Sequence, residues 1–182
     1  MTVNDDAELR ELLDPSYQDD LDNEGGWVDA APFRAHLRRL TRESGVPWRT
    51  LAMLAEVPAA CIEHLVVGHT GRPLHRLHPM VAQRLFLLTL DVVRDAALLP
   101  IRPGRTGELL RRLRASGWPY EELGRRGGVP AHQLAELAAG RAKSCSQLTA
   151  ATVRALAQAL WDVPPSAAQP EPEPADLAAA AA

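Results

Sequence analysis

SGVPWRTLAMLAEVPAACIEHLVVG, residues Ser44–Gly68, recurs 72 residues later as SGWPYEELGRRGGVPAHQLAELAAG, residues Ser116–Gly140. Nine of the 25 aligned positions are identical, among them two prolines and the final glycine. The likeness extends upstream, because Leu-Arg-Arg-Leu stands at both 37–40 and 110–113. A chain of 182 residues with such an internal repeat is expected to fold as two similar units.

Apolar residues recur at helical spacing in both units, so the sequence predicts an all-α fold without strands. Four helices are expected in each unit, and the segment from Asp91 to Leu98 adds a short one between them. Prolines at 79, 119 and 130 are well placed to open helices, and Thr149 is expected to cap the last one. The predicted inward-facing residues are Leu37, Leu40, Leu51, Leu54, Ile62, Leu65, Val81, Leu85, Leu88, Leu109, Leu110, Leu113, Leu123, Leu134, Leu137, Val153, Leu156 and Leu160.

Each repeat also predicts two short helices joined by a tight turn, which is the helix-turn-helix arrangement. The first helix of this motif needs a small residue where the second crosses it, and Ala52 and Gly124 meet that need. The turn favours a residue that tolerates a positive φ. Gly128 meets this demand in the second unit, whereas the first unit carries Glu56 there at some cost in stability.

Both units resemble the lambda-repressor-like (Xre-type) helix-turn-helix domain, which occurs in tandem in actinobacterial and actinophage regulators. The resemblance rests on residues 51–58 and 123–130, followed by Ile62 and Leu134, and it covers residues 33–161. It implies two tandem domains of four to five helices. It also implies that the second motif helix of each unit enters the major groove of DNA.

The resemblance assigns base reading to the start and the exposed face of each second motif helix. Histidine and glutamine side chains there can bond base edges, glutamates can accept from cytosine N4, and alanine methyls can touch thymine methyls. The alternative is an ordinary solvated helix face, since an acid near phosphates is unfavourable unless it meets a cytosine. The predicted base-reading residues are Ala59, Ala60, Glu63, His64, Ala131, His132, Gln133 and Glu136.

Basic and polar residues beside these helices are expected to grip phosphates. Trp48 and Tyr120 open the first motif helices, where they either donate to a phosphate or pack on a neighbouring helix. The basic segment 102–105 either lays an arginine in a minor groove, as a flexible arm does, or serves as a spacer. The predicted phosphate and groove residues are Trp48, Arg49, His69, Thr70, Arg72, Arg102, Arg105, Tyr120, Arg141, Lys143 and Ser144.

The net charge of −3 conceals a sharp partition along the chain. Residues 1–31 hold ten acids and one base, and residues 162–182 hold four acids and no base. The residues between them hold 19 bases and nine acids, a balance of +10 that suits a polyanionic partner, unless the arginines are simply scattered over a helical surface. The predicted domains are an acidic disordered tail (1–31), a first helix-turn-helix domain (32–98), a basic linker (99–105), a second such domain (106–162) and a disordered Pro/Ala-rich tail (163–182).

Patterns for other functions are weak or missing. Cys61-x-x-His64 with His75-x-x-His78 offers ligand types that zinc accepts, but its spacing matches no zinc finger, so no metal is expected. The sequence contains no recognisable catalytic or cofactor motif, which predicts neither an enzyme nor a cofactor. It also lacks a signal peptide pattern and an apolar run long enough to span a bilayer, so a cytoplasmic, nucleoid-associated protein is expected.

The sequence therefore predicts a transcriptional regulator that binds specific double-stranded DNA sequences as a monomer or a homodimer. Its acidic N-terminal tail would recruit RNA polymerase or another protein, or would mask the basic core. The alternative is a protein-interaction adaptor or antitoxin-like module that uses the same units as docking surfaces. The acidic, alanine-rich faces of the second motif helices favour this alternative.

Overall fold

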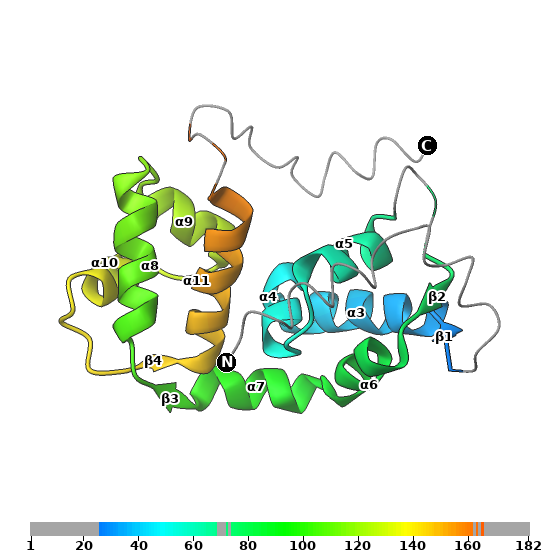
Figure 1. The fold of residues 1–182 in the computed structure, drawn as a ribbon. Helices are drawn as coiled ribbons and strands as arrows, with labels where there is room; N and C mark the ends of the chain where they lie inside the picture. The colour runs from blue at the N-terminus through cyan, green and yellow to red at the C-terminus, as the bar shows by residue number, and fades with distance from the viewer. Residues whose placement is uncertain (1–25, 69–71, 73, 162, 164, 166–182) are drawn as a thin grey trace, which may run out of the picture.

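The structure, a computed structural model, describes residues 26–68, 72, 74–161, 163 and 165. Within these residues nine helices are joined by short connections and four strands of two residues each, so the predicted all-α class is confirmed (Figure 1). Most of the two predicted tails lies outside the described residues.

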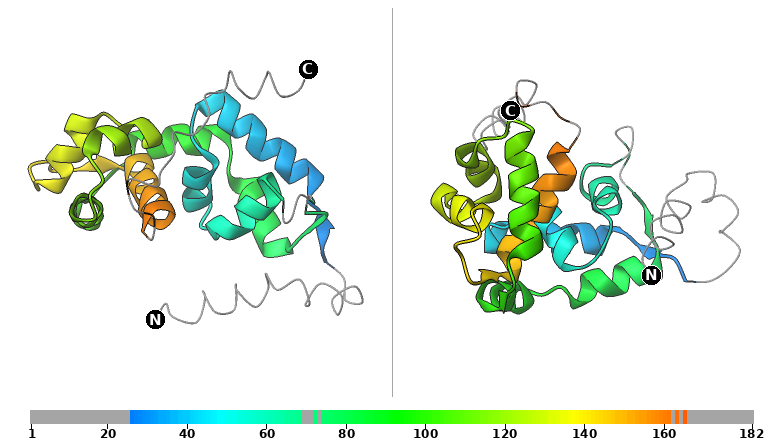
Figure 2. Two further views of the ribbon diagram at one scale, coloured as in Figure 1. Left: turned by 90° about the horizontal axis from the view of Figure 1, so that it is seen from above. Right: turned by 60° about the vertical axis from the view of Figure 1, so that its left-hand side comes forward.

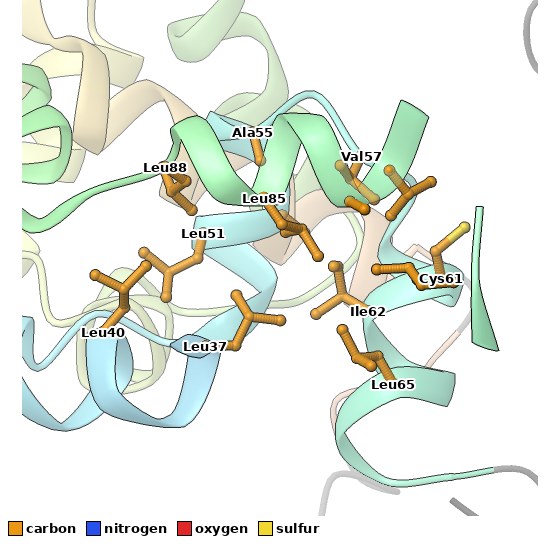
Figure 3. Packing of buried hydrophobic residues seen from close by; sticks show 14 of the residues in the cluster. Leu37, Leu40, Leu51, Ala55, Val57, Cys61, Ile62, Leu65, Leu85 and Leu88 are labelled. Atoms are coloured by element: carbon orange, nitrogen blue, oxygen red, sulfur yellow. The ribbon is translucent and has the colours of Figure 1, made fainter. Parts of the chain in front are cut away.

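Five helices enclose a first apolar core. They are α3 (Ala31–Ser44), α4 (Trp48–Leu54), α5 (Ala59–Val66), α6 (Pro79–Leu87) and α7 (Leu90–Leu98). Leu37, Leu51, Ile62, Leu65 and Leu85 are fully buried where these helices meet, as the helical spacing predicts (Figure 3). We refer to this part of the chain as unit 1.

Four further helices enclose a second, separate core and form unit 2. They are α8 (Gly104–Ala115), α9 (Tyr120–Gly127), α10 (Ala131–Ala138) and α11 (Gln147–Leu160). Leu110, Leu123, Leu134 and Leu137 are buried there, again as expected. Trp118 is also buried in this core, although the sequence pattern did not select it, because it precedes a helix and has no helical periodicity.

The expectation of no strands is wrong. Antiparallel pairs join β1 (Val28–Asp29) to β2 (Arg76–Leu77) and β3 (Pro100–Ile101) to β4 (Cys145–Ser146). Each pair ties the residues before the first helix of a unit to those before its fourth helix. Two residues are too few to produce the alternating pattern by which a strand is recognised in a sequence.

Two further local expectations need correction. Residues 99–105, predicted as a basic linker, belong largely to regular structure: Pro100 and Ile101 form β3, and α8 begins at Gly104. The cap of α11 is Ser146, whose side chain accepts a hydrogen bond from the Thr149 backbone N–H at 3.0 Å. Thr149 is instead buried within the first turn of the helix.

The same geometry joins α4 to α5 and α9 to α10. The turn residues Glu56 and Gly128 both adopt a positive φ, of 54° and 66°. A Cβ atom on Gly124 would lie 2.6 Å from the backbone oxygen of Val129, so α9 and α10 cross too closely for a larger residue. Ala52, fully buried, occupies the matching position of α4. Both sequence predictions about this turn are therefore confirmed.

Replacing Glu56 by glycine is expected to stabilise the protein by about 1 kcal/mol, because glycine adopts a positive φ without the steric penalty of a Cβ atom. Gly128→Ala should cost a similar amount, since nothing lies within 4 Å of the added Cβ and only the backbone strain changes. Thermal unfolding of both variants measures the two effects. Equal melting temperatures for the wild type and the two variants would show that these turns are not strained.

The helix α11 lies between the two units. It packs against α8 and α9 of unit 2 and also against α4 and α7 of unit 1. Two views of the ribbon show α5 and α10 on opposite sides of this central contact (Figures 1 and 2). The second motif helices are thus separated by the packed pair of α4 and α11.

Candidate nucleic-acid interface

The helix α5 buries one face and presents the other to solvent. Cys61, Ile62 and Leu65 enter the core, whereas Ala60 and Glu63 are exposed. Ala59 and His64, also predicted to read bases, are half-buried at the edges of the exposed face. The predicted base-reading residues of unit 1 therefore lie on or beside one surface of this helix.

The helix α10 repeats this arrangement in unit 2. Leu134, Leu137 and Ala138 are buried, and His132 is exposed near the start of the helix. The other predicted base-reading residues of this unit are half-buried, namely Ala131, Gln133 and Glu136. His132 is accordingly the most accessible polar side chain that α10 offers.

An ion pair crosses from α4 to the exposed face of α5. A guanidinium nitrogen of Arg49 lies 3.3 Å from a carboxylate oxygen of Glu63, and the same guanidinium stacks over the Trp48 ring at 4.6 Å. Trp48 itself is half-buried against the unit 1 core. These contacts hold Arg49 beside α5 and neutralise the acid that faces outward.

A second ion pair lies at the end of α10. Gly140, with a φ of 70°, reverses the chain so that the Arg141 N–H donates to the Glu136 carbonyl at 3.0 Å. The Arg141 side chain then donates to one Glu136 carboxylate oxygen through two nitrogens, at 3.0 and 2.7 Å. These hydrogen bonds lower the pKa of Glu136 and raise that of Arg141. The side chains of Arg141 and Glu136 keep 63% and 47% of their surface exposed, so the pair contributes little to stability.

The basic loops after α5 and α10 differ in how far they are described. His69 and Thr70 lie outside the described residues, and Arg72 is exposed. In unit 2 Lys143 and Ser144 are exposed beside Arg141. The structure thus places a small basic group, Arg141 with Lys143, next to the C-terminal end of α10.

Tyr120 is half-buried at the start of α9, where it packs against the unit 2 core and meets the Arg114 guanidinium at 5.9 Å. This packing, together with that of Trp48, corresponds to the alternative of contacts to neighbouring helices. Arg102 and Arg105 are exposed, but Arg105 lies in the first turn of α8 and Arg102 follows β3. Residues 102–105 therefore form the end of the β3 connection and the start of α8, and not a flexible arm.

Two arginines that the sequence pattern did not select position the motif helices. Arg34 of α3 donates to the carbonyls of Leu65 at 2.8 Å and Leu74 at 2.6 Å. Arg111 of α8 donates to the carbonyl of Ala138 at 2.9 Å. Each satisfies a carbonyl at the C-terminal end of α5 or α10, where a helix lacks internal partners. Because α3 and α8 contain several arginines, the sequence does not distinguish Arg34 and Arg111 from those that face solvent.

Among the described residues, no group of three or more histidine, cysteine or acidic side chains is placed to hold a metal ion. Burial raises the pKa of Cys61 to about 11, so this thiol stays protonated near neutral pH. No helix in the described part of the chain is both long and apolar enough to cross a membrane.

The chain matches no family model, no curated protein and no solved structure. Its function must therefore be inferred from its own sequence and geometry.

Proposed function

We propose that the protein binds specific double-stranded DNA sequences through two helix-turn-helix units and regulates transcription. One observation carries this proposal: the α4–α5 and α9–α10 pairs share a positive φ in the turn and a crossing at a small residue. There the Val57 N–H donates to the Ala52 carbonyl at 3.0 Å, and the Val129 N–H donates to the Gly124 carbonyl at 3.2 Å. Such a crossing presents the second helix of each pair outward, which is what insertion into a major groove requires. In this proposal α5 and α10 are the reading helices.

Small side chains at the surface of both reading helices support close approach to a groove. Ala59 and Ala60 open α5, and Ala131 opens α10, so the first residue of each helix carries only a methyl group toward the base edges. His132 then supplies a hydrogen bond to a base edge, while Arg141 and Lys143 hold a phosphate. Glu136 accepts from a cytosine when Arg141 moves to the phosphate.

The partners of such a regulator are double-stranded DNA and, through the acidic residues 1–31, RNA polymerase or another protein. Monomer binding to an asymmetric site fits the divergence of the two reading helices, since Ala60, Glu63 and His64 of α5 correspond to His132, Ala135 and Glu136 of α10. Homodimer binding to a palindrome is the other arrangement that the two units allow.

A second candidate function is a protein-interaction adaptor, in which the exposed faces bind another protein. Two observations favour it. The outward acids of both reading helices are paired with arginines, which leaves these faces nearly neutral. Exposed apolar side chains also lie on α6 and α7, including Phe86, Leu87 and Leu98, at 73%, 63% and 80% exposure.

Selection of bound duplexes from a random DNA library distinguishes the two functions. A DNA-binding regulator enriches a defined sequence, and its affinity for that sequence falls steeply with salt because bound cations are released from the phosphates. His132→Ala should lower affinity for the enriched sequence by about tenfold while leaving affinity for unrelated DNA unchanged. An adaptor enriches nothing and binds no duplex at low salt. Equal losses on every sequence would contradict a base-reading role for His132.

A further inference from the structure

The helix α11 buries two opposite faces, only one of which belongs to its own unit. Val153, Leu156 and Leu160 enter the unit 2 core. Ala151 and Ala155 are also buried, at 0% and 5% exposure, yet neither belongs to the apolar cluster of either unit. At about 100° per residue, both alanines point away from Val153. Something outside unit 2 must therefore cover them.

Unit 1 provides that cover. The helices α4 and α7 pack against α11, and Thr50 of α4 and Ala96 of α7 are buried at 1% and 3% exposure. Small residues on all three helices let their backbones approach closely. A backbone hydrogen bond also joins the end of α7 to the start of α11: the Leu99 carbonyl accepts from the Gln147 N–H at 2.9 Å.

The surface of α4 that packs against α11 has no equivalent on α9, the matching helix of unit 2. The repeat aligns Thr50 and Met53 of α4, neither of which belongs to the unit 1 apolar cluster, with Glu122 and Arg125 of α9. There Glu122 accepts hydrogen bonds from Arg125 at 2.8 Å and from Arg126 at 2.6 Å. Burying this ionic cluster under another helix would cost more than it returns. The contact between α4 and α11 is therefore a specialised joint and not a repeating stack.

We infer that the joint between α4 and α11 makes the two units one rigid body, which holds α5 and α10 at a single separation and rotation. This inference rests on the proposed function for its consequence: the ligand is a duplex whose two half-sites stand at one fixed spacing. A protein with a flexible linker would instead accept a range of spacings.

Residual dipolar couplings of the full chain test the rigid body without DNA. The wild type should fit one alignment tensor across both units. Ala151→Glu, which places a charge in the joint, should require two tensors, whereas Gln158→Glu, an equal change of charge at an exposed position of the same helix, should keep one. Two tensors for the wild type would overturn the inference, as would one tensor for Ala151→Glu. The wild-type measurement decides the question even where the Ala151→Glu variant fails to fold.

Duplexes with a lengthened spacer then test the consequence. Inserting about five base pairs between the halves of the selected site turns one half to the far side of the duplex. The wild type should lose about 100-fold in affinity, because only one unit can still bind. Ala151→Glu should bind the original and the lengthened site within about threefold of each other. Unchanged wild-type affinity for the lengthened site would overturn the inference. A failure to select any sequence would instead reject the proposed function, and the coupling measurement would still stand.

Discussion

Replacing Gly124 by valine is expected to destabilise the protein by about 3 kcal/mol, at the upper end of overpacking costs. A Cβ atom at this position would lie 2.6 Å from the Val129 oxygen and 3.3 Å from the Ala131 nitrogen. Both are backbone atoms, one in the turn before α10 and one in its first residue, so neither can rotate away as a flexible side chain would. Either α10 moves outward or the turn loses its geometry. Urea unfolding measures the loss as a lower midpoint.

Gly104→Val is the matched control for this substitution. Gly104 opens α8, and nothing lies within 4 Å of a Cβ atom added there. The control should unfold within about 0.5 kcal/mol of the wild type, because a surface change without new contacts has little effect. A Gly124→Val protein as stable as this control would contradict the tight crossing of α9 and α10. It would also remove the observation on which the proposed function depends.

The double variant Arg141→Glu/Lys143→Glu is expected to weaken binding to every duplex by about 10- to 100-fold near 0.1 M salt. It removes two cations beside the C-terminal end of α10 and places two anions there. The slope of log affinity against log salt should become shallower by about two, since two phosphate contacts are lost. Gel-shift titrations of one specific and one unrelated fragment across salt measure both quantities.

Arg38→Glu/Arg42→Glu provides the control for total charge. Both arginines are exposed on α3, which makes no part of the proposed interface, and the charge change is the same. This control should lower affinity less and should leave the salt slope nearly unchanged. Glu136→Gln should tighten binding to unrelated DNA, because it removes the acid that holds Arg141, and should change the base preference at the cytosine that Glu136 contacts in the selected sequence. Equal losses in the two double variants would contradict a local contact at Arg141 and Lys143.

The turn chemistry of both motifs could be predicted from the sequence because it depends on neighbouring residues. The motif requires a small residue at position 124 and a residue that tolerates a positive φ at position 128. Both requirements are local and do not depend on the rest of the fold. Glu56 shows that the requirement is geometric, since this non-glycine residue is also held at a φ of 54°. The inward-facing leucines could be predicted for the same reason, from helical spacing alone.

The charge arrangement of the candidate site could not be predicted in the same way. Arg141 reaches Glu136 only because Gly140 reverses the chain, and Arg49 reaches Glu63 only because α4 and α5 cross. A count of basic residues along the sequence treats every arginine as available to bind a phosphate. In the structure, Arg34 and Arg111 bond helix carbonyls, and Arg49 and Arg141 bond glutamates.

Packing between two such small units is expected, but the faces that form the joint could not be predicted from the sequence. Ala151 and Ala155 are small and only weakly hydrophobic, and alanine occurs on all sides of α11. The hydrophobic pattern of this helix therefore does not reveal its second buried face. The composition of residues 99–105, with two prolines and two arginines, is typical of a spacer. Backbone bonding of β3 to β4 makes it part of unit 2.

Footprinting on the strongest selected duplex determines whether both units read DNA. Two protected segments about one helical turn apart, with roughly 10 base pairs between their centres, are expected if α5 and α10 each occupy a major groove. His132→Ala should change protection and base preference in one segment only, since only unit 2 carries this residue. A single short protected segment would contradict DNA reading by both units, as would uniform protection that shows no preferred sequence.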